Sequence, residues 1–473
     1  MSEPAKASTR ARPAVVIGLV VALVVAGAVI VRFRPKSVEV VEEKAPLAPE
    51  SDPSTMALQW SSAELDGLIY ARPVLAGDLV VVATENNSLY GLDRGTGHTT
   101  WGPTHIGNAT PLRDLERQGK PEGCGNIDPL GITGAPGVDP ATGTAFAVAE
   151  VLADPAQPPA HLLVGVDVRT GAQRFAPISV DPPGADTKVL QQRPAIAVAN
   201  GRAYVTFGGL AGDCGDYHGW VVAVPTSGTE PPAFYEVAPQ PETNRGGAIW
   251  APVGPSIDAQ GNVYVATGNS FEPPPDPAFD RGDAVIELSP TLEEIGWWAP
   301  STYREDNEVD ADLGSTSPLL LPGDLVFQIG KRGTGYLIST RVPGANPLGG
   351  IGGEVAQTDI CAAYGGSAFR APLIYAACTN GLHGVELDTQ GSAPALRVKW
   401  RARVLATGPP VVDGDVVWST DPANRAVYGL DATTGAVRTQ RRDVGPMTRF
   451  TTPTVSGDTV YVATGASLVT LAR

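Results

Sequence analysis

Short runs of apolar and β-branched residues, separated by Gly, Pro, Asp and Asn, repeat from about residue 57 to the end of the chain. One recurring unit is a strand of small residues, a tight turn and a β-branched strand, as in residues 71–85, 254–268, 409–421 and 452–465. A second unit is an alternating strand, the turn Asp-x-x-Thr-Gly and another strand, as in residues 89–101, 164–175 and 427–435. In such a turn the Asp side chain accepts backbone hydrogen bonds and the Gly supplies a positive φ. The pattern therefore predicts consecutive antiparallel hairpins rather than helices.

The two units together predict one four-stranded antiparallel blade, and several blades must pack around an axis because one alone leaves both faces exposed. Residues 56–473 are therefore predicted to form an all-β, eight-bladed β-propeller, with starts near Ala71, Gly131, Arg193, Gly254, Thr316, Ala368, Pro409 and Thr452. Seven blades is the alternative, because the fifth and sixth repeats are degenerate. The last repeat has three strands only, and residues 57–60 (ALQW) resemble the missing outer strand, with Trp60 in the place of Trp101 and Trp400. We expect this N-terminal strand to close the ring and remove its open edge.

An uncharged apolar run fills residues 14–31 (AVVIGLVVALVVAGAVIV). At about 1.5 Å per residue it spans roughly 27 Å, close to the hydrocarbon core of a bilayer. It predicts a transmembrane anchor between a cytoplasmic N-terminus (residues 1–13) and a flexible Pro- and Glu-rich linker (residues 32–55). A cleaved signal peptide, with its site at residues 26–28 (AGA), is the alternative. The propeller is expected outside the cytoplasm, at the cell membrane.

Composition and charge narrow the classes of partner. Charged residues make up 18% of the chain and the formal net charge is −16, whereas phosphate binding needs clustered Lys and Arg. Nucleic acid is therefore not an expected partner. An acidic surface mainly favours solubility.

The chain has four cysteines, Cys124, Cys214, Cys361 and Cys378, with no CxxC pair and no His at metal-ligand spacing. An even count in an exported chain predicts two disulfides. A predicted hairpin that turns near residues 370–372 would bring Cys361 and Cys378 together, which leaves Cys124 and Cys214 as the other pair. Four reduced, buried thiols are the alternative.

The Asp-x-x-Thr-Gly repeat with its following Trp resembles that of pyrroloquinoline quinone (PQQ) type propellers, from residue 58 onward. Two branches share this repeat: quinoprotein dehydrogenases, and cofactor-free scaffolds similar to the outer-membrane barrel-assembly lipoprotein. The repeat cannot choose between them, because one fold hosts many functions.

Motifs in the middle blades resemble the dehydrogenase branch. The resemblance implies that Trp250, in GGAIW, stacks under the quinone and that Asn269, in YVATGN, ligates Ca²⁺. It also implies that Asp310, in the sequence Asp-Ala-Asp, is the general base and that Lys331 contacts the quinone oxygens. Structural alternatives exist for each: a blade-core Trp, a turn Asn, a solvated acidic loop and a surface Lys.

Several features of that branch are missing. The adjacent Cys-Cys pair has no counterpart, and neither has the Glu that ligates Ca²⁺; Asp213 and Asp216 lie in the equivalent loop, and Asp213 is the candidate ligand. No C-x-x-C-H haem site is present either. We therefore expect a membrane-anchored, extracytoplasmic binding or scaffold module with no cofactor, which takes a protein or small-molecule ligand on the funnel face of the propeller. The alternative is a PQQ- and calcium-dependent oxidoreductase acting on an alcohol or sugar.

Overall fold

The computed structural model describes residues 45–473, apart from 238–244, 272–278, 392 and 473. The predicted cytoplasmic segment (residues 1–13), the apolar run (14–31) and most of the expected linker lie outside these residues. Among the described residues, no helix is both long and apolar enough to cross a membrane.

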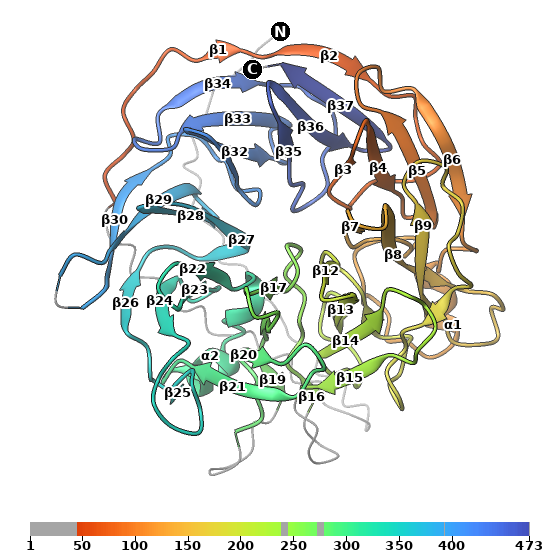
Figure 1. Ribbon diagram of the computed structural model, residues 1–473, viewed down its shortest axis with the longest axis horizontal. Coiled ribbons are helices and arrows are strands. Elements are labelled where there is room, and N and C mark those ends of the chain that lie inside the picture. Colours follow the sequence, from red (N-terminus) through yellow and green to blue (C-terminus); the bar gives the residue numbers. More distant parts are fainter. Residues whose placement is uncertain (1–44, 238–244, 272–278, 392, 473) are drawn as a thin grey trace, which may run out of the picture. The chain divides into compact units, whose positions relative to one another are not determined.

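Across the described residues the sheets form eight blades around a common axis (Figure 1). From the innermost strand outward, the first blade consists of β3 (Val74–Ala76), β4 (Leu79–Ala83), β5 (Ser88–Asp93) and β6 (Thr99–His105), and the second of β7 (Gly137–Asp139), β8 (Thr144–Val151), β9 (Ala160–Asp167) and β10 (Ile178–Ser179). The third blade consists of β12 (Ala197–Ala199), β13 (Arg202–Gly209), β14 (Trp220–Pro225) and β15 (Ala233–Glu236). The fourth consists of β17 (Ser256–Ile257), β18 (Val263–Ala266), β20 (Val285–Leu288) and β21 (Glu294–Ala299). Three short strands accompany them, β11 (Leu190–Gln191) on β13 and the pair β16 (Arg245–Gly246) and β19 (Ser270–Phe271).

The remaining four blades are β22 (Leu319–Leu321), β23 (Leu325–Ile329), β24 (Thr334–Ser339) and β26 (Ala356–Asp359); β27 (Ala363–Arg370), β28 (Leu373–Cys378), β29 (Gly381–Asp388) and β30 (Ala395–Arg401); β31 (Val411–Asp413), β32 (Val416–Asp421), β33 (Ala426–Asp431) and β34 (Val437–Arg441); and β35 (Thr454–Ser456), β36 (Thr459–Thr464), β37 (Ser467–Ala472) and β2 (Ala57–Ser61). A short strand, β25 (Gly350–Ile351), runs parallel to β21. Each predicted start lies at or within a few residues of an innermost strand, so eight blades is confirmed and the alternative of seven is wrong.

Aromatic side chains lock neighbouring blades together. Trp101 on β6 donates its indole N–H to the Val168 carbonyl of the next blade at 2.8 Å. Its ring lies over Gly171, where an added Cβ would come within 2.3 Å of it. Gly171 also has a φ of +70°, so the backbone conformation and the contact with Trp101 both require glycine at this position. This contact explains why the Asp-x-x-Thr-Gly turn of one blade and the Trp of the blade before it recur together.

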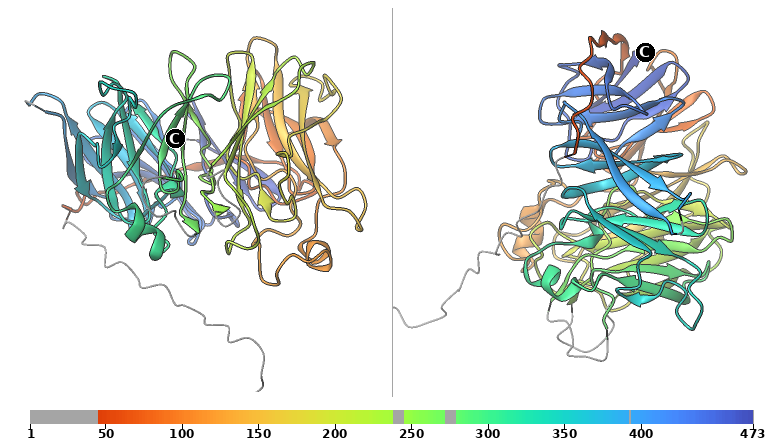
Figure 2. Two further views of the ribbon diagram at one scale, coloured as in Figure 1. Left: turned by 90° about the horizontal axis from the view of Figure 1, so that it is seen from below. Right: turned by 90° about the vertical axis from the view of Figure 1, so that its left-hand side faces the viewer.

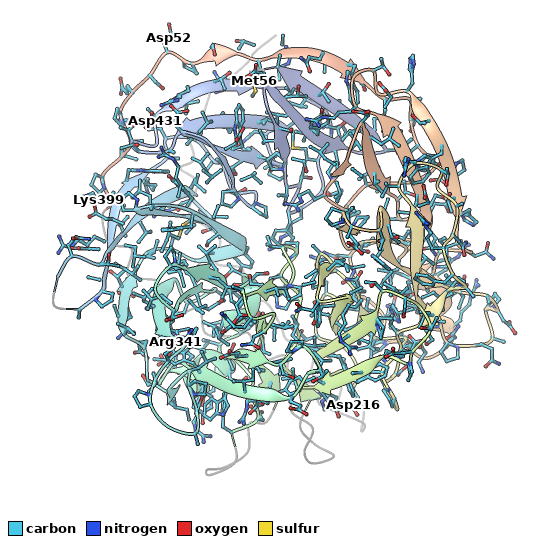
Figure 3. The ribbon with its side chains drawn as sticks, viewed as in Figure 1. Asp52, Met56, Asp216, Arg341, Lys399 and Asp431 are labelled. Atoms are coloured by element: carbon cyan, nitrogen blue, oxygen red, sulfur yellow. A yellow bond between two sulfur atoms is a disulfide. The ribbon has the colours of Figure 1, made fainter. Side chains whose placement is uncertain are left out.

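The N-terminal strand closes the ring as predicted. β2 pairs antiparallel with β37, from Ala57 opposite Ala472 to Ser61 opposite Val469. The Trp60 ring packs on Gly97 of the first blade as Trp101 packs on Gly171. Met56, labelled in Figure 3, is 1% exposed and donates its N–H to the Gln440 carbonyl. The N-terminal strand therefore completes the eighth blade and covers the outer edge of β37.

Part of the expected linker is also in contact with the propeller. The N–H of Ala48 bonds the Arg401 carbonyl, and the N–H of Arg401 bonds the Pro46 carbonyl, both at 2.8 Å. β1 (Ser54–Thr55) then runs parallel to β34. Residues 45–55 thus cover the outer strands of the sixth and seventh blades.

Both predicted disulfides are confirmed. Cys361 and Cys378 lie 5.7 Å apart (Cα–Cα) across the base of the β27–β28 hairpin. Cys124 and Cys214 lie 6.1 Å apart (Cα–Cα) and join a loop of the first inter-blade connection to a loop of the third blade.

Chain direction decides which loops meet. Strands alternate in direction, so the loops from second to third strand and those from the outermost strand to the next blade all emerge on one face, here called the funnel face. The helices α1 (Leu112–Arg117) and α2 (Tyr303–Glu308) and the 3₁₀ turn η1 (Leu313–Ser315) belong to such loops. Figure 2 shows α1 and α2 on the same side of the ring.

Candidate functional site

A cavity of about 350 Å³ opens among the funnel-face loops. Four of the five candidate cofactor, metal or catalytic residues line it: Asp213, Trp250, Asp310 and Lys331. Asp312 lines it as well. These residues come from the third, fourth and fifth blades, and the ring brings them together.

Trp250 presents a half-buried ring to the cavity. Main-chain bonds fix the segment before it, because the Gly247 N–H bonds the Asn269 carbonyl and the Gly268 N–H bonds the Ala248 carbonyl, both at 2.9 Å. The ring centroid lies 6.3 Å from that of Tyr364 and 5.8 Å from the Lys331 ammonium. The ring is therefore available to a ligand, in addition to the contact that it makes with the core of the third blade.

Lys331 bridges the two carboxylates of the Asp-Ala-Asp sequence. Its Nζ lies 2.6 Å from Asp310 Oδ1 and 2.7 Å from Asp312 Oδ2. Burial lowers the pKa of Lys331, but the charges of Asp312 and Asp310 raise it more, so the net shift is upward. Burial raises the pKa of Asp310, as does the charge of Asp312, while Lys331 opposes the rise. The three groups form one compact ion-paired cluster.

The two predicted metal ligands, Asn269 and Asp213, contact this part of the cavity in different ways. Asn269 meets the cluster through its main chain, since its N–H donates to Asp312 Oδ1 at 2.9 Å. Asp213 accepts the Tyr217 hydroxyl at 2.7 Å, and burial together with the charge of Asp312 raises its pKa. Asp216 is not among the residues that line the cavity, and Figure 3 places it toward the outer edge of the ring.

Two arginines that the sequence analysis missed as site residues, Arg193 and Arg449, also line the cavity. Arg193 donates to Asn126 Oδ1 at 3.2 Å, and its guanidinium lies 5.7 Å from the centroid of the Phe450 ring. Arg449 lies 4.8 Å from the same centroid and 5.3 Å from that of Tyr364. Burial lowers the pKa of Arg193, and so does the charge of Arg449. No motif marks either residue; both lie in connections between blades.

The oxygen atoms available at the cavity decide whether Ca²⁺ could bind here. Ca²⁺ takes six to eight oxygen ligands, but Lys331 already holds one oxygen of Asp310 and one of Asp312. Within the described ranges, the one group of three or more His, Cys, Asp or Glu side chains close enough to share a metal is Cys361, Cys378 and His383, whose sulfurs form a disulfide. The carboxylates at this cavity do not fit a Ca²⁺ site. A planar anionic group does fit, because an aromatic face and cationic side chains border the same space.

Comparison with known proteins gives the family and the fold. The family model described as outer membrane protein assembly factor BamB matches residues 29–157 and 364–473. The crystal structure of BamB from Moraxella catarrhalis is similar with a TM-score of 0.55 and 13% identity, over 89% of this chain and 100% of that one. A europium-containing methanol dehydrogenase is similar with a TM-score of 0.60 and 14% identity, over 88% of this chain and 93% of that one. No curated protein matches.

Proposed function

The chain belongs to the PQQ-type β-propeller family represented by the outer membrane protein assembly factor BamB, and we propose that it is a membrane-anchored binding module on the extracytoplasmic side. Its ligand on the funnel face is a small planar molecule that carries an anionic group. The two disulfides support an extracytoplasmic location, because disulfides persist in oxidising compartments. The apolar run at residues 14–31 supports the anchor.

The observation that carries this proposal is that two groups of charged side chains, here called the acidic half and the basic half, line the cavity together with Trp250. The centroid of the Trp250 ring lies 5.8 Å from the Lys331 ammonium and 6.3 Å from the centroid of Phe450, the ring that both arginines contact. Asp213, Asp310 and Asp312 form the acidic half, with Lys331 paired to two of them. Arg193 and Arg449 form the basic half; both lie against the Phe450 ring, and Arg193 also donates to the Asn126 side-chain amide. A planar ligand would stack on Trp250, turn its anionic group to the arginines and offer hydrogen-bond donors to the acidic half.

A PQQ-dependent oxidoreductase is the second candidate, favoured because Trp250, Asp310 and Lys331 border one space. Bound PQQ would supply a two-electron acceptor. Trp250 would hold its ring, the cationic side chains would bind its carboxylates, and Asp310 would accept the proton of a substrate hydroxyl. The ion pair of Asp310 with Lys331 weighs against this role, because a base held by an ammonium is less able to take a proton. The Cys124–Cys214 disulfide also joins residues 90 apart, so it is no adjacent-cysteine platform.

A titration of the purified protein with PQQ, with and without Ca²⁺, separates the candidates. We expect weak but saturable quenching of indole emission, which is lost in Trp250→Ala, and no alcohol-dependent dye reduction. Trp297→Phe is the matched control, because it removes another partly buried indole that stacks against Arg281 outside the cavity. Alcohol-dependent dye reduction would establish the second candidate instead. An absence of quenching would refute the small-molecule site and leave a protein partner as the ligand.

A further inference from the structure

Lys331 is built into the acidic half of the cavity rather than resting on its surface. Its main-chain N–H donates to the Asp312 carbonyl at 3.0 Å. Gly330 packs so closely there that an added Cβ would lie 2.4 Å from the same carbonyl oxygen. The side chain of Lys331 is 18% exposed and that of Asp312 is 9% exposed. Main-chain and side-chain contacts together thus hold the ammonium between the two carboxylates.

A divalent cation at these carboxylates would have to displace that ammonium. The Asp312 Oδ1 atom is already bonded to the Asn269 N–H, and its Oδ2 atom is bonded to Lys331. A cation on the same oxygens would lie within a few ångströms of a like charge, and the low dielectric of a half-buried site strengthens that repulsion.

The nearest additional carboxyl groups offer little to a cation. Asp283 interacts electrostatically with Asp312, and burial together with the charge of Asp312 holds its pKa well above the usual range. One oxygen of Asp283 accepts the Leu313 N–H at 2.9 Å. One carboxylate oxygen of Asp213 accepts a hydrogen bond from the Tyr217 hydroxyl. While Lys331 occupies Asp310 and Asp312, the ligands that remain are too few for Ca²⁺.

We infer that Lys331 supplies the positive charge that a divalent cation would otherwise supply. The cavity is therefore a metal-independent version of the Ca²⁺ site that the resemblance to the dehydrogenase branch implies. The inference rests on the proposed function only in locating the ligand at this cavity. It predicts that removal of the ammonium creates a cation site, because Asp310 and Asp312 are then left as an unpaired pair of carboxylates.

Terbium luminescence tests this inference without knowledge of the natural ligand. Trp250 can sensitise Tb³⁺ bound in place of the ammonium, which lies 5.8 Å from the centroid of the indole ring. We expect Lys331→Ala to bind Tb³⁺ with sensitised emission that excess Ca²⁺ displaces, at least about tenfold more tightly than wild type. Lys331→Arg, which keeps the positive charge, should not gain this emission. Trp250→Phe in the Lys331→Ala background should lose the emission.

Lys399→Ala is the matched control for the change in net charge. Lys399 lies on β30 at the outer edge of the ring and pairs with Glu386 at 3.2 Å (Figure 3). It should behave as wild type. Two outcomes would overturn the inference: wild type that binds Tb³⁺ with Trp250-sensitised emission as tightly as Lys331→Ala, or a folded Lys331→Ala protein with no gain. Failure of PQQ to quench wild type in EDTA would count against the proposed ligand class and leave the terbium comparison unaffected.

Discussion

Glu85 is a fully buried carboxyl group at the end of β4, between the first and second blades, and it makes stability depend on pH. Its Oε2 accepts the Gly131 N–H at 2.7 Å and the Thr133 hydroxyl at 3.1 Å. Burial raises its pKa to about 8 from 4.5, although these two hydrogen bonds oppose the rise. The charge of Glu150 raises the pKa further and that of Arg193 lowers it.

The sign of the effect follows from proton linkage. The folded state holds the Glu85 proton more tightly than the unfolded state does, so the stabilisation is fully present below pH 4.5 and is lost as pH rises through about 8. At about 1.36 kcal/mol per pKa unit, the shift corresponds to roughly 5 kcal/mol across that window. A propeller of this length has an unfolding entropy of about 0.9 kcal/mol per kelvin, so the expected change in Tm is roughly 5 °C.

Glu85→Gln removes the proton equilibrium but keeps the shape and the acceptor oxygen. We expect the variant to melt close to wild type near pH 5 and about 5 °C above it at pH 8.5. Calorimetry at one scan rate over this range measures the difference. Glu122→Gln, at an exposed position, is the control and should follow wild type throughout.

His161 also titrates in the alkaline part of the range. Burial lowers its pKa, but its contacts with Asp181 and Glu150 raise it more, to about 9. Its contribution to stability is therefore present below pH 6.5 and lost toward pH 9. Wild type and Glu85→Gln share this loss, so the difference between them reports on Glu85. Parallel Tm curves for the two proteins would refute the argument.

Two further predictions concern the packing of the blades and the topology. Gly171→Ala should cost about 1–3 kcal/mol more than Gly143→Ala by denaturant unfolding; both glycines end an Asp-x-x-Thr-Gly turn with positive φ, but an added Cβ meets the Trp101 ring at 2.3 Å in the first and Val168 at 3.7 Å in the second. Equal losses would show that the docking of Trp101 contributes little. Protease added to intact spheroplasts should digest or release the propeller, and a fully protected chain would contradict the proposed topology.

The repeat made most of the fold predictable. The Asp-x-x-Thr-Gly turn and the docking Trp are local features with a fixed spacing, so blade number and ring closure through Trp60 could be predicted. The packing of residues 45–55 could not, because it depends on main-chain bonds such as that from Ala48 to Arg401, which leave no apolar pattern. Arg193 and Arg449 were missed for a related reason: the connections that carry them lie outside the periodic strands.

The state of Glu85 also bears on the charge of the cavity. Arg193 lines the cavity, and within the described part of the chain no carboxylate forms an ion pair with it. Glu85 is the carboxyl group whose charge acts on Arg193, and with a pKa of about 8 it is mostly protonated at neutral pH. The guanidinium charge therefore stays uncompensated where a ligand would bind, whereas the ammonium of Lys331 is already taken by two carboxylates. An anionic group should for this reason bind beside Arg193 and Arg449 rather than beside Lys331, which is the orientation that the proposed function requires.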